Sequence, residues 1–423
     1  SGNDTFIAGS GNDSFTGGSG TNWVSYVNST AGVVVNLSTN TATGYGTDVL
    51  SGISHAIGST YDDTFIGPNN NTSNSFTGGG GIDTVSYANV SANLVIHLDT
   101  GTITGRGTDR VSGIENAIGG TGNDQFFGDG NDNVFAGGLG NDSYTGNGGI
   151  DTVSYDSSTA AINATLSNGA GSSTGQGSDV FVSGIERIIG SDFNDTLTGS
   201  FGNQTFAGGL GNDVINGGSG SGDTVDYSPS ATAVTVNLAT GTATGEGTDT
   251  ISNIENIIGS EQNDTLTGNS SANTIDGGGG SDLLIGGGGA DFLQGGAGDD
   301  ILRFENSLTS FSGGLGEDTL QLSAGLSLNL TSLPDAQFSG LEHIDMVTDA
   351  SANTLTLAMG DVLATSDTTD TLFVEGDSND HVVTTDSWTA GGTEVHGATT
   401  YQVYTSGLAT LLVDTDINQT GIM

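Results

Sequence analysis

The sequence contains no cysteine and no lysine, and arginine occurs only at positions 106, 110, 187 and 303. Without cysteine no disulfide bond can stabilise the fold, so we expect bound metal ions to provide the cross-links. Without a basic patch the chain has nothing to meet the phosphates of a nucleic acid, which argues against nucleic-acid binding. No stretch approaches the roughly 20 consecutive apolar residues of a membrane-spanning helix, so no membrane span is expected.

Acidic residues and glycine are present in large excess. Aspartate and glutamate together number 49, and the formal net charge is −45 at pH 7. A compact chain with this charge repels itself, and bound divalent cations are the simplest way to neutralise it. A disordered acidic tail would carry similar charge, but such tails lack the aromatic and β-branched residues that recur here at set spacings. The 74 glycines leave little room for helix over residues 1–303.

Three nine-residue units follow one another without interruption: GGGGSDLLI (277–285), GGGGADFLQ (286–294) and GGAGDDILR (295–303). Each fits the pattern GGxGxDxUx, in which U is a large apolar residue. The glycines allow a tight turn in which backbone carbonyls converge, the aspartate adds a carboxylate, and the apolar residue turns inward from a short strand. Hard oxygen ligands of this kind favour Ca²⁺.

The apolar position of the nonapeptide also recurs in degenerate units elsewhere in the chain. Because every occupant is large and apolar, we expect these side chains to fill one core, coil by coil. They are Phe6, Phe15, Phe65, Phe76, Phe126, Phe135, Tyr144, Leu197, Phe206, Ile215, Leu266, Ile275, Leu284, Leu293 and Leu302.

A longer repeat of about 61–72 residues encloses the nonapeptides. Its four copies occupy 22–48, 83–109, 151–179 and 223–249, and each leads into a string related to SGIENAIGG. Strings such as VVVNL and VTVNL alternate inward and outward residues as strands do, and the TG and GTD steps predict turns. Repeats of this kind stack on one another and share one continuous core. The copies share a tyrosine, which is Tyr26, Tyr87, Tyr155 or Tyr227.

With these motifs the chain resembles the RTX proteins, whose hemolysin-type calcium-binding nonapeptide repeats form β-rolls. The resemblance implies an all-β fold, a right-handed parallel β-roll or β-helix solenoid with calcium-binding turns over residues 1–321. Residues 322–423 resemble the mostly β cap and type I secretion region at the end of such proteins, and DVLAT (361–365) predicts a short helix. Because the family is exported from Gram-negative bacteria, we expect a secreted, extracellular protein at the cell surface.

The resemblance also implies which residues bind calcium. In an RTX β-roll two nonapeptides form one coil, so residues 18 apart stack on the same edge, and each ion lies between successive turns. The expected carboxylate and amide ligands are Asp4, Asp63, Asp83, Asp124, Asn133, Asp142, Asp151, Asp195, Asp213, Asp264, Asn273, Asp282, Asp291, Asp300 and Asp318. The glycines expected to form the calcium-binding turns are Gly277, Gly279, Gly286, Gly288 and Gly295.

These ligands are expected in rows. One edge carries Asp264, Asp282, Asp300 and Asp318, and the other edge carries Asn273 and Asp291. The further pairs are Asp124 with Asp142, Asn133 with Asp151, Asp195 with Asp213, and Asp63 with Asp83 across an insertion. An amide adds no charge, so the edges at Asn74, Asn133, Gln204 and Asn273 are expected to bind weakly or stay empty. Isolated aspartates such as Asp99 and Asp156 are expected to be solvated turn residues.

Enzymatic motifs are poorly represented. The five histidines show no HExxH spacing, which argues against a metalloprotease. A single GxSxG occurs at 171–175, in a Gly/Ser-rich turn rather than between a strand and a helix, so no nucleophile elbow is expected. We therefore expect a protein that is not an enzyme.

The sequence favours an extracellular calcium-binding scaffold that folds on Ca²⁺ after export, as an adhesin, filament or surface-layer component. Its expected partners are calcium ions and either further copies of itself or a cell-surface or glycan ligand. Two alternatives stay open: the tail of a secreted enzyme with an upstream catalytic domain, and an ice-binding module that uses the TATG and TITG strings. Since SGNDTFIAGS begins within a repeat and forms no signal peptide, we expect further sequence before residue 1.

Overall fold

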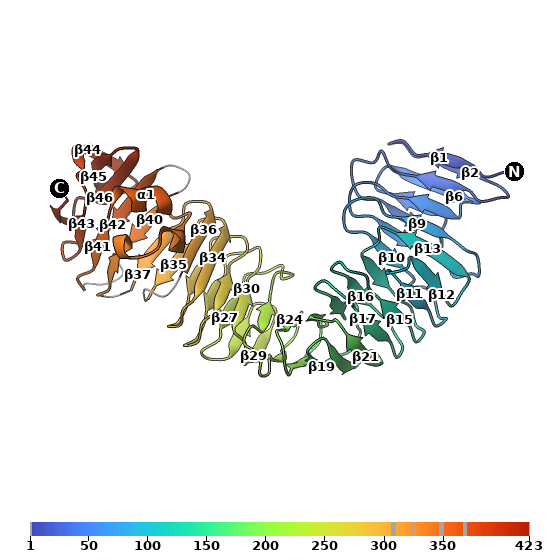
Figure 1. Cartoon of the computed structure of the whole chain (residues 1–423). Coiled ribbons are helices and arrows are strands. Elements are labelled where there is room, and N and C mark those ends of the chain that lie inside the picture. Colours follow the sequence, from blue (N-terminus) through green and yellow to red (C-terminus); the bar gives the residue numbers. More distant parts are fainter. Residues whose placement is uncertain (1, 306–309, 324, 347–350, 367–369, 423) are drawn as a thin grey trace. The chain divides into compact units, whose positions relative to one another are not determined.

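The computed structural model describes residues 2–305, 310–323, 325–346, 351–366 and 370–422. Short strands dominate, and the helices in these ranges are α1 (Met359–Thr365) and the 3₁₀ helices η1 (Leu330–Ser332) and η2 (Asp335–Gln337). None of the described helices is long and apolar enough to cross a membrane. Figure 1 shows strands stacked in successive coils within each of two compact units, Ser1–Gly220 and Ser221–Met423. The prediction of an all-β parallel solenoid is confirmed.

Each coil contributes one short strand to each of two sheets. β15 (Gln125–Phe127) pairs in parallel with β17 (Ser143–Thr145), whereas β16 (Val134–Ala136), which lies between them in the sequence, pairs with β18 (Thr152–Ser154). Phe126 lies opposite Tyr144, so residues 18 apart stack on one another. Glycine-rich turns connect the two sheets, because a tight reversal requires backbone conformations that other residues adopt at a cost.

The unit Ser1–Gly220 contains a first sheet and a second sheet. In order of pairing, the first sheet consists of β1 (Thr5–Ile7), β3 (Trp23–Ser25), β7 (His55–Ile57), β9 (Ser75–Thr77), β13 (Thr108–Ser112), β12 (Thr102–Thr104), β11 (Val95–His97), β15, β17, β21 (Ser178–Ser183), β20 (Ala170–Thr174), β19 (Asn163–Ser167), β23 (Thr196–Gly199) and β25 (Val214–Asn216). The second sheet consists of β2 (Ser14–Thr16), β6 (Thr47–Ser51), β5 (Thr41–Thr43), β4 (Val34–Asn36), β8 (Thr64–Ile66), β10 (Thr84–Ser86), β14 (Asn116–Ile118), β16, β18, β22 (Arg187–Ile189) and β24 (Thr205–Ala207).

The unit Ser221–Met423 contains three groups of strands. The first consists of β29 (Thr248–Ser252), β28 (Thr242–Thr244), β27 (Thr235–Asn237), β31 (Thr265–Thr267), β33 (Leu283–Ile285), β35 (Ile301–Phe304), β37 (Thr319–Leu322), β40 (His343–Asp345), β42 (Thr371–Glu375), β46 (Ala409–Asp414), β45 (Thr399–Ser406) and β44 (Thr389–His396). The second consists of β26 (Thr224–Asp226), β30 (Asn256–Ile258), β32 (Thr274–Asp276), β34 (Phe292–Ala297), β36 (Ser310–Leu315) and β39 (Phe338–Ser339). The third consists of β38 (Ser327–Asn329), β41 (Thr354–Leu357), β43 (His381–Thr384) and β47 (Asn418–Gly421).

The core is a column of inward side chains between the two sheets. Phe126, Phe135 and Tyr144 are fully buried, and the rings of Phe126 and Tyr144 stack with centroids 5.1 Å apart. The predicted core positions are therefore correct, with two exceptions. Phe6 and Phe15 are only half-buried, because they lie in the first described coils and are covered from one side.

Each long repeat also contains a meander of three antiparallel strands, which the sequence analysis did not predict. β12 pairs antiparallel with both β11 and β13, and β11 and β13 then pair in parallel with the next and the previous coil. The prediction of a turn at GTD is wrong for its last two residues. In the second copy, Thr108 and Asp109 belong to β13, and Asp109 is buried. Turn chemistry explains the meander: Asn168 and Gly169, at φ 49° and 79°, close the hairpin between β19 and β20.

The described residues after 321 continue with strands. The predicted helix at DVLAT is confirmed, since α1 covers Met359–Thr365. β37 pairs in parallel with β40, β40 with β42, and β42 with β46, so the parallel ladder extends past residue 321. A domain boundary at 321 stays a prediction.

Candidate metal centres

The turns between the two sheets carry rows of buried polar residues. Each such residue lies two positions before an inward apolar side chain, as Asp282 lies before Leu284. In the row before β31, β33, β35 and β37, the carboxylate Oδ1 of one coil accepts the backbone N–H of the previous coil. Asp264 donates to Asp282 at 2.7 Å, Asp282 to Asp300 at 2.8 Å, and Asp300 to Asp318 at 2.9 Å. The structure thus brings this expected row together; metal ligation by it stays a prediction.

The other expected pairs also meet, each through a backbone N–H that donates to a side-chain oxygen. Such bonds fix the carboxylates at the surface of the core rather than in solvent. They join Asp124 to Asp142 (2.7 Å), Asn133 to Asp151 (2.9 Å), Asp195 to Asp213 (2.7 Å), Asn273 to Asp291 (2.9 Å) and Asp63 to Asp83 (2.7 Å). Asp4 was expected as a ligand without a named partner, and its backbone N–H donates to Asn22 Oδ1 at 3.1 Å.

The second carboxylate oxygen distinguishes some of these residues from others. Within the described residues, no group donates a hydrogen bond to the buried Oδ2 atoms of Asp142, Asp151, Asp282, Asp300 and Asp318. A buried charged oxygen without a partner is costly, so such an atom needs either a proton or a cation. We call these five residues the open carboxylates.

Glycine makes a small polar space beside the open carboxylates. A Cβ at Gly277 would collide with Asp282 Oδ2 and with the carbonyl oxygen of Gly295, one coil further on. A Cβ at Gly295 would likewise collide with Asp300 Oδ2 and the Gly313 carbonyl. Carboxylate and carbonyl oxygens therefore converge where no side chain can enter, and all-oxygen surroundings of this kind fit Ca²⁺.

The remaining expected glycines differ in their surroundings. Gly286 resembles Gly277, since its Cβ would collide with Asp291 Oδ2. Gly279 instead faces the Glu261 carboxylate, and Gly288, at φ 133°, has open space around it. The structure does not bring Gly279 and Gly288 against an edge aspartate.

Burial acts strongly on the protonation of the edge carboxyls. It raises the pKa of Asp282 and Asp142 from 3.8 to about 8, and that of Asp151 and Asp318 to about 7. Neighbouring carboxylates add to this effect; for Asp282 they belong to Asp300 and Asp264. A bound cation would reverse the shift, because it favours the ionised form.

Another set of expected ligands is already satisfied on both oxygens. In three of these carboxylates, a backbone N–H four residues earlier donates to Oδ2 at 2.5 Å. The pairs are Ser59 with Asp63, Ser191 with Asp195, and Ser260 with Asp264. Gly120 donates to Asp124 Oδ2 at 2.9 Å. These carboxylates begin each block, directly after the SGIEN-like strings, and they have fewer lone pairs to offer a cation than the open carboxylates.

The side-chain amides of the edge asparagines and glutamine also donate hydrogen bonds to backbone carbonyls. Asn133 Nδ2 donates to the carbonyl of Glu115 at 2.9 Å, and Asn273 Nδ2 donates to the carbonyl of Glu255 at 2.7 Å. Gln204 Nε2 donates to the Phe201 carbonyl at 2.6 Å. An N–H donor thus occupies carbonyl oxygens that would otherwise be free to face an ion.

Sequence reasoning missed the glutamates of the SGIEN-like strings as edge residues. The Oε2 atom of each glutamate accepts a backbone N–H from an edge aspartate at 2.8–3.1 Å. The donor and acceptor pairs are Asp83 and Glu115, Asp151 and Glu186, Asp223 and Glu255, and Asp318 and Glu342. The signal was present, because each glutamate lies two positions before an inward apolar residue, as each edge aspartate does.

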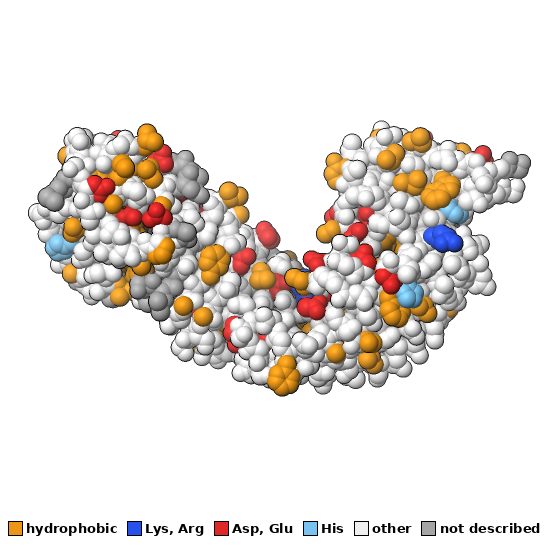
Figure 2. Space-filling view, in the orientation of Figure 1, with side chains coloured by type: hydrophobic (Ala, Val, Ile, Leu, Met, Phe, Trp, Pro, Cys, Tyr) orange, Lys and Arg blue, Asp and Glu red, His pale blue; other side chains and the backbone are white. Residues whose placement is uncertain are grey.

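The described residues bring together no group of three or more His, Cys, Asp or Glu side chains that could hold a metal ion. A calcium ion at an edge would therefore depend on one or two carboxylates and on backbone carbonyls. Figure 2 shows acidic side chains at several places on the visible face, most of which is uncharged.

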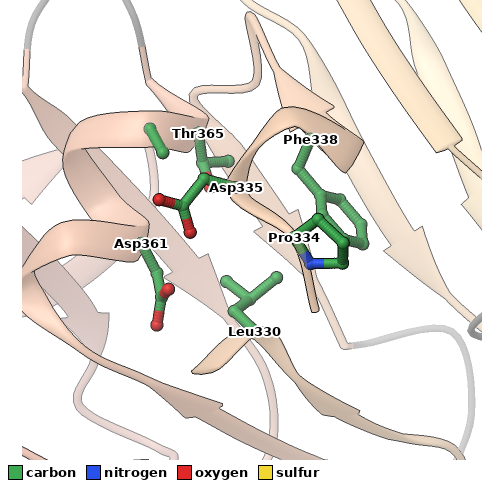
Figure 3. A pocket seen from close by; sticks show the side chains of 7 residues that line it. Leu330, Pro334, Asp335, Phe338, Asp361 and Thr365 are labelled. Carbon is green, nitrogen blue, oxygen red and sulfur yellow. The ribbon is translucent and has the colours of Figure 1, made fainter. Parts of the chain in front are cut away.

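Two cavities have linings other than the edge carboxylates. A cleft of about 380 Å³ is lined by Glu317, His343, Thr371, Phe373 and His396. Figure 3 shows a smaller cavity, of about 10 Å³, at which the carboxylates of Asp335 and Asp361 lie; it has room for about one water molecule. Neither lining contains serine, cysteine or lysine.

The single GxSxG motif lies within a strand. Ser173 is buried in β20, and its hydroxyl donates to Asp179 Oδ2 at 3.0 Å. A nucleophile elbow instead exposes its serine between a strand and a helix.

Comparison with known families adds one match. The family described as the RTX calcium-binding nonapeptide repeat (4 copies) matches residues 1–26, 118–153, 182–215, 189–222, 249–284 and 277–306. These ranges include the pairs Asp124–Asp142, Asp195–Asp213 and Asp264–Asp282. No curated protein matches the chain.

Proposed function

Since this chain is an RTX-repeat protein, we propose that it is a calcium-dependent structural scaffold of a secreted protein, which folds when its edges bind Ca²⁺. The open carboxylates carry this proposal. At Asp282 and Asp300 a buried carboxylate oxygen that has no donor among the described residues lies near a backbone carbonyl, in a space that only glycine permits. Calcium supplies the missing positive charge and accepts several oxygen ligands at once.

The charge of the whole chain supports the same role. A net charge of −45 opposes compaction, and each bound ion removes two units of it. Low calcium before export would favour the unfolded chain, and higher calcium outside would favour the folded one. The scaffold would then serve as part of an adhesin, a filament or a surface layer, with calcium as its cofactor and a cell-surface ligand or further copies of itself as partner.

Circular dichroism of the whole chain tests calcium-dependent folding. We expect a weak β signal in EDTA and full recovery on addition of millimolar Ca²⁺, since extracellular calcium modules bind with affinities of about 10⁻⁴–10⁻³ M. Mg²⁺ at the same concentration is the control, and we expect it to restore less because it loses its water ligands reluctantly. An unchanged β signal in EDTA would sink the proposal.

A second candidate function, ice binding, rests on one patch in the unit Ser221–Met423. Threonines of four neighbouring strands lie opposite one another: Thr248 and Thr244, Thr244 and Thr235, and Thr235 and Thr265. Their side chains alternate with buried residues, so they point to the same outer surface, with strands about 4.8 Å apart. The row ends at Leu283, opposite Thr265. Thermal hysteresis of the calcium-loaded protein tests this candidate, and its loss in Thr244→Val would support it.

A further inference from the structure

The edge positions of the long repeats are occupied by a third kind of aspartate. Asp48, Asp109 and Asp179 lie two residues before the inward side chains of Leu50, Val111 and Phe181, as the open carboxylates do before theirs. Their Oδ1 atoms accept the backbone N–H of the previous coil, from Asp13 at 2.8 Å, Asn74 at 2.7 Å and Asp142 at 2.9 Å. Their position and this hydrogen bond place them in the same rows of edge residues as the open carboxylates.

Their second carboxylate oxygen, Oδ2, however, accepts a hydrogen bond from a side chain of the protein. The phenolic hydroxyl of the repeat's shared tyrosine donates to Oδ2, and the pairs are Tyr26–Asp48 at 2.8 Å, Tyr87–Asp109 at 2.6 Å, Tyr155–Asp179 at 2.9 Å and Tyr227–Asp249 at 2.8 Å. All four tyrosines and all four aspartates are buried. The same oxygen lacks a described donor in Asp282 and Asp300.

A buried hydroxyl and a calcium ion satisfy the same need of a carboxylate. Both place positive charge against the lone pairs of Oδ2, and a charge-assisted O–H···O⁻ bond in a buried site is strong. Burial and the adjacent aspartate raise the pKa of Tyr87 and Tyr155 well above 10, so the hydroxyls keep their protons. With the tyrosine in place, Oδ2 is neither open to an ion nor short of a partner.

We propose that the four Tyr–Asp pairs are calcium-independent closures of the edge, in which the tyrosine hydroxyl takes the place that an ion takes at the open carboxylates. This inference rests on the proposed function and refines it. Calcium then binds in the nonapeptide blocks, and the coils of the long repeats separate these blocks from one another. The D-x-U pattern alone would assign calcium to both kinds of aspartate.

Counting bound calcium in matched variants of the whole chain tests this. Asp48→Asn and Asp282→Asn make the same chemical change at equivalent edge positions, and in each the amide oxygen can still accept the backbone N–H of the previous coil. We expect Asp48→Asn to bind as many ions as the unmodified chain and Asp282→Asn to bind at least one fewer, by equilibrium dialysis against Ca²⁺ alone. Circular dichroism first establishes that each variant folds in calcium.

Tyr26→Phe is the second variant, should Asp48→Asn fail to fold. It removes only the donor, so we expect a lower melting temperature in calcium with an unchanged calcium count. Loss of an ion in either Asp48→Asn or Tyr26→Phe would overturn the closure and leave calcium-dependent folding intact. If the unmodified chain bound no calcium, the proposed function would fail and the closure with it.

Discussion

At the residue scale, the two oxygens of an edge aspartate have different roles. In Asp300, Oδ1 accepts the backbone N–H of Asp282 at 2.8 Å and so holds two coils in register. Oδ2 has no described donor and lies beside the Gly295 turn. The side chain is therefore both a structural link and a candidate ligand, and a substitution can remove one role without the other.

Glycine at the edge is predicted to be important where the backbones of two coils approach closely. Gly296 has φ 108°, and a Cβ there would collide with the carbonyl oxygen of Gly278. We expect Gly296→Ala to lower the free energy of unfolding in calcium by about 1–3 kcal/mol, from backbone strain and the clash. Urea denaturation measures it. Gly130→Ala is the control, since nothing lies within 4 Å of its Cβ and its φ is ordinary; equal losses in both variants would contradict the prediction.

The raised pKa values predict opposite pH responses with and without calcium. A folded-state pKa of about 8 for Asp282, against 3.8 ordinarily, means that the folded chain binds this proton more tightly than the unfolded chain. Without calcium, this stabilisation is complete below about pH 4 and is lost as the pH rises through 8. With calcium the ionised form is required, so the apparent affinity rises over the same range.

Thermal melts in EDTA and calcium titrations at pH 5, 6, 7 and 8 measure these two responses. We expect the melting temperature of any residual structure in EDTA to fall with increasing pH, while calcium binds more tightly. Calcium affinity that did not change between pH 5 and 8 would contradict burial of the edge carboxyls.

At the element scale, strands of three residues are too short to be stable alone, so each depends on its neighbours in the stack. β15 is held between β11 and β17, and its single inward residue, Phe126, contacts the rings of Phe135 and Tyr144. The stability of an element here is mostly the stability of its interfaces with the coils on either side.

Removal of one inward ring should therefore affect adjacent coils. We expect Phe126→Ala to cost about 3–5 kcal/mol of unfolding free energy in calcium, the usual range for a buried aromatic. Phe201→Ala is the matched control, because Phe201 is 67% exposed, and it should change the stability by less than about 0.5 kcal/mol. Hydrogen exchange should show lost protection in β11 and β17 for Phe126→Ala alone; protection lost only within β15 would contradict coupling between coils.

At the scale of the whole molecule, repulsion between like charges adds to the conformational entropy that opposes folding. With 49 acidic residues and only four arginines, the chain has almost no internal ion pairs available to it. Monovalent salt screens repulsion between exposed carboxylates, but it cannot serve the buried oxygens of the edges.

Small-angle scattering separates screening from specific binding. We expect the radius of gyration in EDTA to decrease slightly on addition of NaCl and to decrease much further in CaCl₂ of equal ionic strength. The difference between the two salts measures the ions bound at the edges. Equal compaction in NaCl and CaCl₂ would mean that screening alone drives folding.

The sequence by itself determined the β class and the inward apolar positions, because glycine turns, carboxylates and apolar residues recur with one period. The coil of two nonapeptides and the aspartate pairs were implied by the resemblance to RTX proteins. Pairs such as Asp282 and Asp300 follow from that implied coil, and the structure brings them together. The difference between Asp282 and Asp48 needed the tertiary structure. Both precede an apolar residue by two positions, but only a meander of antiparallel strands places Tyr26 against Asp48 Oδ2. Tertiary contacts across 22 residues decide which carboxylate oxygen has a donor, and no local pattern encodes them.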